Sequence, residues 1–149
     1  MLEFVIPCLL GLESLVGDEV KKLGLNDVHV ENGRVLCRGE ARDIARLNIN
    51  LRCGARVILV LHRFRATDFE ALFQGVRAVR WEDWIPREGE FPVVGYSISS
   101  TLHSVPACQS IVKKAVVERL KRHYKTAWFQ ENGAEYPIDV SIHRSEERR

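Results

Sequence analysis

The sequence contains no long apolar run, and its apolar start is interrupted early. A membrane-spanning helix needs about 18 to 20 apolar residues in succession, and no segment approaches that length. Residues 1–17 have the apolar character of a targeting segment, but Glu3 stands where such a segment carries positive charge, and Pro7 breaks the run. We therefore expect a strand followed by a helix in this region, no membrane partner and a cytoplasmic location.

The sequence also has few of the patterns that bind metals or carry catalysis. Its four cysteines, Cys8, Cys37, Cys53 and Cys108, form no Cys-x-x-Cys pair, and neither they nor the five histidines have the spacing of a zinc site. No Gly-x-Gly-x-x-Gly run, phosphate-binding loop or nucleophile elbow is present. We expect plain buried or half-buried thiols in a reducing compartment, no metal, no cofactor in this chain and no catalytic residue.

Net charge is only +2, but it is unevenly distributed along the chain. Residues 34–65 contain eight arginines against two acids, and residues 101–128 contain six lysines and arginines against one acid. The segments 1–33, 66–100 and 129–149 are net acidic. The two basic blocks could form surface patches that attract an anionic polymer. Ordinary solvated helix faces explain the same charges, so charge alone leaves both interpretations open.

Residues 1–65 are predicted to form a ferredoxin-like domain with the element order βαββαβ. The expected strands are residues 3–9, 27–30, 35–38 and 56–65, and the expected helices are residues 12–23 and 41–52. Asn32-Gly33 between two alternating runs is a strong β-hairpin signal, and Gly24 stands where a helix C-cap glycine belongs. The order predicts an antiparallel sheet with two helices on one face.

Residues 66–149 are predicted to form a second, α/β domain with the order ααβαβ. The expected helices are residues 68–80 and 104–124, with a short turn at 81–85, and the expected strands are residues 91–99 and 137–144. Thr67 is the expected N-cap of the first of these helices. A strand–helix–strand crossover implies a parallel pair of strands. The predicted fold class is therefore α+β.

A hydroxyl-rich segment joins the expected strand 91–99 to the expected helix 104–124. Free N–H groups at a helix start favour an anion such as phosphate, and serine and threonine hydroxyls add phosphate or sugar contacts. A well-capped helix behind a polar loop is the alternative interpretation. The candidate RNA-binding residues in this segment are Ser97, Ser99, Ser100, Thr101, His103 and Ser104.

The long helix predicted after this segment carries a basic stripe. A basic stripe beside a phosphate-competent helix start is typical of a nucleic-acid groove. The candidate RNA-binding residues on this helix are Lys113, Lys114, Lys121, Arg122 and Lys125.

Aromatic residues near this helix have two interpretations. Tyr96, Tyr124, Trp128 and Phe129 could stack on unpaired bases or belong to the core, and for Trp128 and Phe129 we expect the core. Two acids, Glu82 and Asp83, lie between tryptophans, and we expect them to solvate a helix end.

Five stretches follow one another in an order typical of a known family. They are Phe4-Val5-Ile6-Pro7-Cys8, Gly11-Leu12-Glu13-Ser14-Leu15-Val16-Gly17-Asp18-Glu19, Glu31-Asn32-Gly33-Arg34-Val35, Phe91-Pro92-Val93 and residues 100–115. By these stretches the chain resembles the N-terminal region of bacterial THUMP-domain class I RNA methyltransferases. The group it resembles most methylates guanine N2 in large-subunit ribosomal RNA. The resemblance covers nearly the whole chain, and residues 100–115 are its most specific part.

The resemblance implies a ferredoxin-like domain and a THUMP domain that hold RNA for a class I domain using S-adenosylmethionine. That domain's Asn/Asp-Pro-Pro-aromatic motif does not occur in this sequence. Tyr96 and Ala107 stand where the resemblance leads us to expect Lys and Asp. We therefore expect an RNA-binding module that is not itself an enzyme, with a THUMP domain that is C-terminally incomplete.

The expected function is to position structured RNA, ribosomal RNA in particular, for a methyltransferase domain. The alternative function is a regulatory or small-molecule-binding ferredoxin-like module without an RNA partner, because this fold serves many roles. A standalone enzyme is a third hypothesis. If the last THUMP strand is absent, an exposed sheet edge would allow a homodimer.

Overall fold

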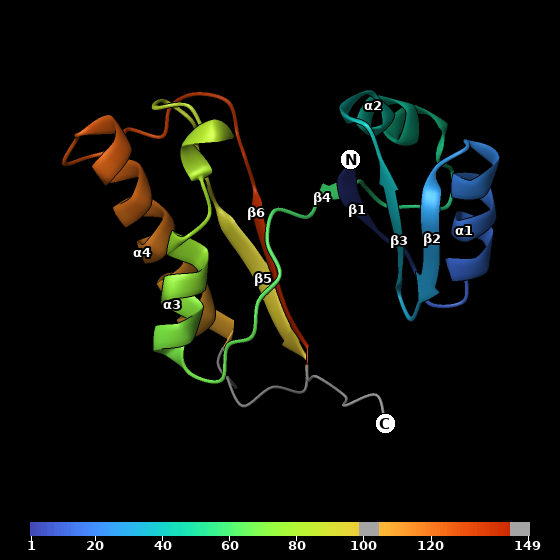
Figure 1. Ribbon diagram of the computed structural model, residues 1–149, viewed down its shortest axis with the longest axis horizontal. Coiled ribbons are helices and arrows are strands. Elements are labelled where there is room, and N and C mark those ends of the chain that lie inside the picture. Colours follow the sequence, from blue (N-terminus) through green and yellow to red (C-terminus); the bar gives the residue numbers. More distant parts are fainter. Residues whose placement is uncertain (99–104, 144–149) are drawn as a thin grey trace. The chain divides into compact units, whose positions relative to one another are not determined.

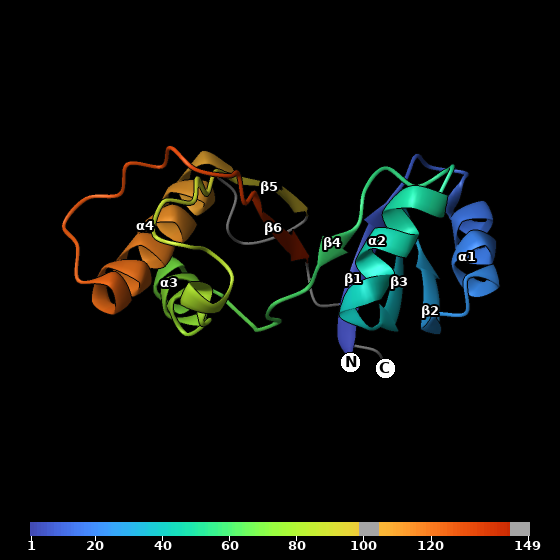
Figure 2. The same ribbon diagram turned by 90° about the horizontal axis from the view of Figure 1, so that it is seen from above.

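The structure, a computed structural model, describes residues 1–98 and 105–143. Its internal contacts divide the chain into two compact units, Met1–Leu61 (unit 1) and His62–Arg149 (unit 2). Both units combine helices with a sheet (Figures 1 and 2). No helix among the described residues is both long enough and apolar enough to span a membrane.

Unit 1 is a four-stranded antiparallel sheet with two helices. In chain order its elements are β1 (Leu2–Pro7), α1 (Glu13–Lys22), β2 (Asn26–Glu31), β3 (Arg34–Gly39), α2 (Ala41–Asn50) and β4 (Ile58–Leu59). The strands lie in the order β2-β3-β1-β4, and every neighbouring pair is antiparallel. This arrangement confirms the predicted ferredoxin-like βαββαβ fold.

Both helices of unit 1 pack on the same face of its sheet. Phe4 of β1 lies opposite Cys37 of β3, so their side chains share one face. Val16 of α1 and Leu47 of α2 are fully buried in the same apolar cluster as these two residues. The alternation of apolar residues along β1 and the helical spacing along α1 therefore encode one common core.

The β2–β3 hairpin is tied to the start of α1. Gly33 has a φ of 75°, the left-handed conformation that the Asn-Gly signal predicts. Its N–H donates to the Glu13 carboxylate at 2.9 Å, and the N–H of Gly11 donates to the same carboxylate at 2.8 Å. The backbone hydrogen bonds from Gly33, from Glu13 itself and from Gly11 lower the pKa of the Glu13 carboxylate. One carboxylate thus connects two loops that are distant in sequence.

The last strand of unit 1 is much shorter than the sequence predicts. The prediction of a strand over residues 56–65 is wrong, because pairing is confined to Ile58–Leu59, with one further hydrogen bond from the Val60 N–H to the Glu3 carbonyl. Since β4 runs antiparallel to β1 with Leu59 opposite Phe4, residues beyond Leu61 have passed the start of β1 at Leu2. The predicted strand is too long because apolar residues occur beyond the point where β1 offers a pairing partner.

The described residues of unit 2 form three helical segments and a parallel pair of strands. Its elements are α3 (Phe69–Arg77), the 3₁₀ turn η1 (Trp81–Asp83), β5 (Val93–Ile98), α4 (Val105–Tyr124) and β6 (Ile138–His143). β5 and β6 pair in parallel with Val93 opposite Ile138, which confirms the crossover prediction. Within the described residues these two strands form the whole sheet of unit 2.

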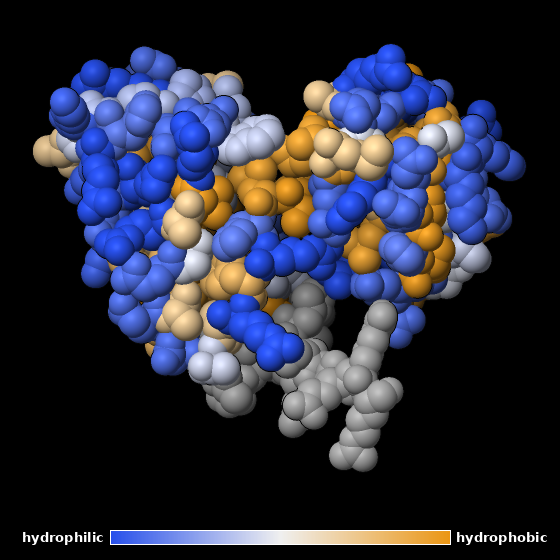
Figure 3. Space-filling model, viewed as in Figure 1, coloured by the Kyte–Doolittle hydropathy of each residue, from blue (hydrophilic) through white to orange (hydrophobic). Residues whose placement is uncertain are grey.

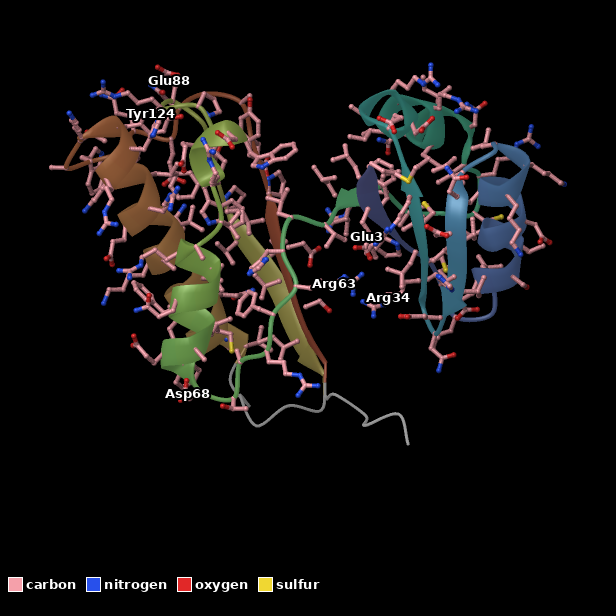
Figure 4. The ribbon with its side chains drawn as sticks, in the orientation of Figure 1. Glu3, Arg34, Arg63, Asp68, Glu88 and Tyr124 are labelled. Atoms are coloured by element: carbon pink, nitrogen blue, oxygen red, sulfur yellow. The ribbon has the colours of Figure 1, made fainter. Side chains whose placement is uncertain are left out.

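The start of α3 differs by one residue from the prediction. Asp68 is the N-cap, because its carboxylate accepts a hydrogen bond from the Ala71 N–H at 2.7 Å (Figure 4). The expectation of Thr67 as the cap is therefore wrong. Both residue types can cap a helix, and only the turn geometry decides between adjacent candidates.

The core of unit 2 forms around the apolar face of α4. This helix packs against α3, η1 and β5. Its fully buried or nearly buried residues are Cys108, Val112, Ala115, Val116 and Leu120. Their helical spacing places them on one side, which confirms the broad apolar face that the sequence predicts. The opposite side of α4 is left to solvent.

Candidate nucleic-acid interface

The hydroxyl-rich segment before α4 lies mostly outside the described residues. Ser99, Ser100, Thr101, His103 and Ser104 fall in the stretch 99–104, which the structure does not describe. The backbone of Ser97 belongs to β5 and lies opposite Ile142 of β6. A phosphate-binding role for these hydroxyl and imidazole groups therefore stays a prediction.

The exposed side of α4 carries four basic residues. Lys114 and Lys121 are two helical turns apart, and Lys125 follows one turn later, so the three lie along one stripe. Arg122 lies beside this stripe. All four are exposed, and no ion pair joins them to another residue in the described part of the chain. We call these four residues the α4 basic stripe.

On the face that Figure 3 shows, hydrophilic residues cover most of the area over α4. Cations that lack an internal partner keep their full charge for an external anion. Three of the four charges stand on α4 and Lys125 follows directly after it, so the spacing of the three on the helix is fixed before any ligand arrives. The arrangement can bind successive phosphates along an extended polyanion.

Lys113 has internal partners, unlike the stripe. Its ammonium donates to the Phe91 carbonyl at 2.9 Å and pairs with the Glu131 carboxylate. It also lies 3.6 Å from the centroid of the Phe91 ring, a cation–π distance. Burial raises the pKa of Glu131, but the bond from Lys113 helps to lower it overall. Lys113 therefore joins α4 to Phe91 before the helix and to Glu131 after it, and its predicted contact with RNA stays a prediction.

Glu82 forms an ion pair with Arg119 at the buried side of α4. The guanidinium donates to both carboxylate oxygens at 2.7 and 3.1 Å, and the Glu82 side chain is only 7% exposed. This bond holds the pKa of Glu82 at about 2, well below its ordinary value of 4.5. The expectation that Glu82 solvates a helix end is therefore wrong. Asp83 does remain half exposed and pairs with Arg80.

A third pair connects α3 to α4 across a shallow groove. Arg77 donates to Glu118 at 2.9 Å and to Gln74 at 2.7 Å. The groove between the helices has a volume of about 220 Å³. It is open and mostly polar, and its lining residues are Gln74, Arg77, Ala78, Glu118, Arg119 and Arg122. Sequence reasoning missed it, because pairing between helices 41 residues apart leaves no local signal.

The aromatic residues after α4 separate into core and surface. Phe129 is 9% exposed and packs edge-on against Phe91, which confirms its expected place in the core. Trp128 is 79% exposed, so its expected burial is wrong. Tyr124, at the end of α4 in Figure 4, donates its hydroxyl to the Ile85 carbonyl at 2.7 Å. The segment turns between Trp128 and Phe129 and buries just one of the two rings.

The burial of the four cysteines follows the sequence expectation. All four cysteines are free: Cys37 and Cys108 are buried, and Cys8 and Cys53 are half-buried. Burial raises the pKa of Cys37 to about 11, which keeps its thiol protonated and unreactive. No metal-binding group of histidine, cysteine and acidic side chains occurs in the part of the chain that the structure describes.

Fold and charge distribution first define a class: a ferredoxin-like unit followed by an α/β unit whose long helix carries a basic stripe. Family comparison then identifies the members of that class. The model of the RlmL ferredoxin-like domain matches residues 3–58, and the model of the THUMP domain matches residues 66–146. The chain belongs to the THUMP-domain family, with an RlmL-type ferredoxin-like domain in front, as the sequence motifs predict.

Two curated relatives are methyltransferases by name. The chain is 44% identical over 135 residues to YpsC of Bacillus subtilis (strain 168), whose name assigns it provisionally to the RNA methyltransferases. It is 34% identical over 119 residues to the ribosomal RNA large subunit methyltransferase K/L of Ectopseudomonas mendocina (strain ymp). These matches cover 89% and 80% of this chain but 35% and 16% of the relatives. The chain thus spans about a third of YpsC and less of the second protein.

Solved structures show the same fold at high similarity. One is a Listeria monocytogenes str. 4b F2365 protein described as a predicted N6-adenine-specific DNA methylase, with a TM-score of 0.89 and 45% identity. Another is SMU.472, described provisionally as a methyltransferase and crystallised with SAH, with a TM-score of 0.88 and 40% identity. Each match covers 95% of this chain, and 37% and 38% of the respective structures.

Proposed function

We propose that this chain is the RNA-binding part of a methyltransferase, and that it positions structured RNA for a catalytic domain. The observation that carries the proposal is the α4 basic stripe. Its four cations stand on one face of the THUMP unit and have no partner among the described residues. Such a face binds phosphates, which fix the register of a nucleic acid without reading its bases.

The substrate is ribosomal RNA in our proposal, and the modified atom is guanine N2. The name of the K/L relative supports ribosomal RNA, and the YpsC name supports RNA in general. The description of the Listeria protein names DNA as the substrate, so the relatives' names disagree on the type of nucleic acid. We favour RNA because two of these three names and the THUMP family model point to it.

The cofactor of the proposed whole protein is S-adenosylmethionine. Support comes from SMU.472, which was crystallised with SAH, the demethylated form of that cofactor. The sequence of this chain has no Asn/Asp-Pro-Pro-aromatic motif, so we assign no catalytic residue to it. Incubation of the 149-residue protein with S-adenosylmethionine and ribosomal RNA should give no methyl transfer.

The alternative of a small-molecule module predicts a closed apolar pocket. The α3–α4 groove is instead open and lined by three arginines and a glutamate. Ligand pockets for small molecules are mostly apolar, with few convergent polar groups. The groove therefore favours the polyanion interpretation. Homodimerisation through an exposed sheet edge stays a prediction.

The experiment replaces two lysines of the α4 basic stripe and measures binding to a ribosomal RNA fragment. Lys114→Glu with Lys121→Glu should raise the dissociation constant by roughly tenfold or more, because each lost phosphate contact retains about one counterion on the RNA. Fluorescence anisotropy gives the affinity, and circular dichroism checks that the variant is folded.

The matched control is Lys21→Glu with Lys22→Glu in the last turn of α1, which changes net charge by the same amount. We expect the control to bind within about twofold of the wild type, since it removes none of the four stripe contacts. An equal loss in both double variants would mean that total charge governs binding. That result, or an unchanged affinity in the α4 variant, would contradict the proposal.

A further inference from the structure

Trp128 is the most exposed of the three tryptophans. Its side chain is 79% exposed, whereas Trp84 is 44% exposed and Trp81 is 7% exposed. Trp81 also donates its indole N–H to the Val76 carbonyl at 2.8 Å, as buried tryptophans usually do. Trp128 therefore presents a large aromatic ring to solvent, where a ligand can reach it.

A short turn fixes the backbone that carries this ring. α4 ends at Tyr124, and Lys125 adopts a left-handed conformation with φ of 51°. The Thr126 hydroxyl then donates to the Trp128 carbonyl at 2.9 Å and accepts from the Trp128 N–H at 3.4 Å. In both ribbon views the segment after α4 loops out beyond the end of the helix (Figures 1 and 2). The ring is therefore held outward on an ordered turn.

Three of the four stripe cations stand just before this turn. Lys121 and Arg122 occupy the last turn of α4, and Lys125 is the first residue after it. A guanidinium or ammonium near an exposed aromatic ring supplies the two components of single-strand recognition, a phosphate contact and a stacking surface. Isolated exposed apolar residues are common, but this one lies at the end of a cationic stripe.

A protein partner would need a different surface. Apolar docking patches contain several contiguous large apolar side chains, with a polar rim. The neighbours of Trp128 in sequence are small or polar (Thr126, Ala127 and Gln130), and Phe129 is already buried. An exposed indole that follows a cationic stripe within three residues matches a nucleobase more closely than it matches a protein core.

We propose that Trp128 stacks on an unpaired base of the bound RNA, while Lys121, Arg122 and Lys125 hold the adjacent phosphates. The inference rests on the proposed RNA-binding function and adds the class of substrate: RNA with a single-stranded segment beside its duplex. Duplex RNA hides the faces of its bases, so only the unpaired part reaches the ring. Trp128 thereby makes the THUMP unit prefer a junction between paired and unpaired nucleotides.

The test compares two RNAs, a duplex with a single-stranded overhang and the same duplex with blunt ends. The wild-type chain should bind the overhang RNA roughly tenfold more tightly, the effect expected for stacking one base. Trp128→Ala should abolish this preference and leave blunt-duplex binding unchanged, and Trp128→Phe should retain most of it. The matched control, Trp84→Ala, removes another exposed indole and should keep the full preference.

Tryptophan emission provides a second, direct readout. In a Trp84→Phe background the overhang RNA should quench emission from Trp128, and the blunt duplex should not, while buried Trp81 contributes equally to both measurements. If Trp128→Ala keeps the wild-type preference, or loses affinity equally for both RNAs, the stacking inference fails and the RNA-binding proposal stands. If the wild-type chain binds neither RNA, the proposed function itself fails, and the inference with it.

Discussion

Both sides of α4 carry lysine and arginine, but the cations of one side are paired within the described part of the protein and those of the other side are not. On its packed side, Arg119 bonds to Glu82 and Lys113 bonds to Glu131 and the Phe91 carbonyl. On its open side, Lys114, Lys121, Arg122 and Lys125 have no partner among the described residues. The comparison teaches that a basic helix can hold two functional sets, one that fastens the fold and one that is available to a ligand.

The largest effect is expected on stability, when the ion pair between Arg119 and Glu82 is removed. Arg119→Met removes the two-bond partner of a carboxylate that is 7% exposed and leaves it only the longer contact of 3.9 Å to Arg80, so unit 2 should be destabilised by about 2 to 3 kcal/mol. Urea denaturation measures the change. The neighbouring Arg122→Met should cost under about 0.5 kcal/mol, as surface substitutions usually do. An equal fall in the free energy of unfolding in both variants would contradict the difference between the packed and the open side of α4.

Acid titration should break the same ion pair by protonating Glu82. Glu82 has a folded pKa of about 2 against an ordinary 4.5, so its ion pair stabilises the fold fully above about pH 4.5. That contribution should be lost progressively as pH falls from about 4.5 through 2, because Glu82 is protonated at a higher pH in the unfolded chain than in the folded one. Comparing the free energy of unfolding of wild type and Glu82→Gln across this window isolates the effect. A variant with the same pH slope as the wild type would show that Glu82 does not titrate in this way.

Lys113 should give a smaller loss of stability and little loss of RNA affinity. Lys113→Met removes a partly exposed ion pair, a bond to the Phe91 carbonyl and a cation–π contact, together worth about 1 kcal/mol. Its dissociation constant for RNA should stay within about twofold of the wild type. If Lys113→Met weakens RNA binding as strongly as Lys114→Met does, then Lys113 belongs with the ligand-binding set.

Local patterns were sufficient to predict most of the fold. The α4 bounds, the Gly33 turn and the parallel β5–β6 pair follow from helical spacing, an Asn-Gly dipeptide and the strand–helix–strand order. The first two signals act within a few residues of the structure that they determine, and the third is the order of neighbouring elements. The overlong β4 shows the limit, because strand length depends on where the partner strand begins.

The candidate site was less predictable, since its division depends on residues distant in sequence. Lys113 and Lys114 are adjacent and identical in type, and the positions of Glu131 and Phe91 decide that Lys113 has internal partners. Glu82 and Arg119 meet from elements 37 residues apart. Trp128 and Phe129 are adjacent aromatic residues that face opposite environments. Composition predicts the presence of charge and aromatic rings, but only tertiary packing decides which of them are accessible.

The most direct test of the RNA-binding account is the salt dependence of affinity. The logarithm of the association constant for a ribosomal RNA fragment is measured against the logarithm of salt concentration, for the wild type, Lys114→Gln with Lys121→Gln, and Lys113→Met. Each phosphate contact contributes about 0.7 to 0.9 to the slope, so the double variant should lower its magnitude by about 1 to 2. Lys113→Met should leave the slope unchanged. A double variant with the wild-type slope would contradict the assignment of the α4 basic stripe to RNA.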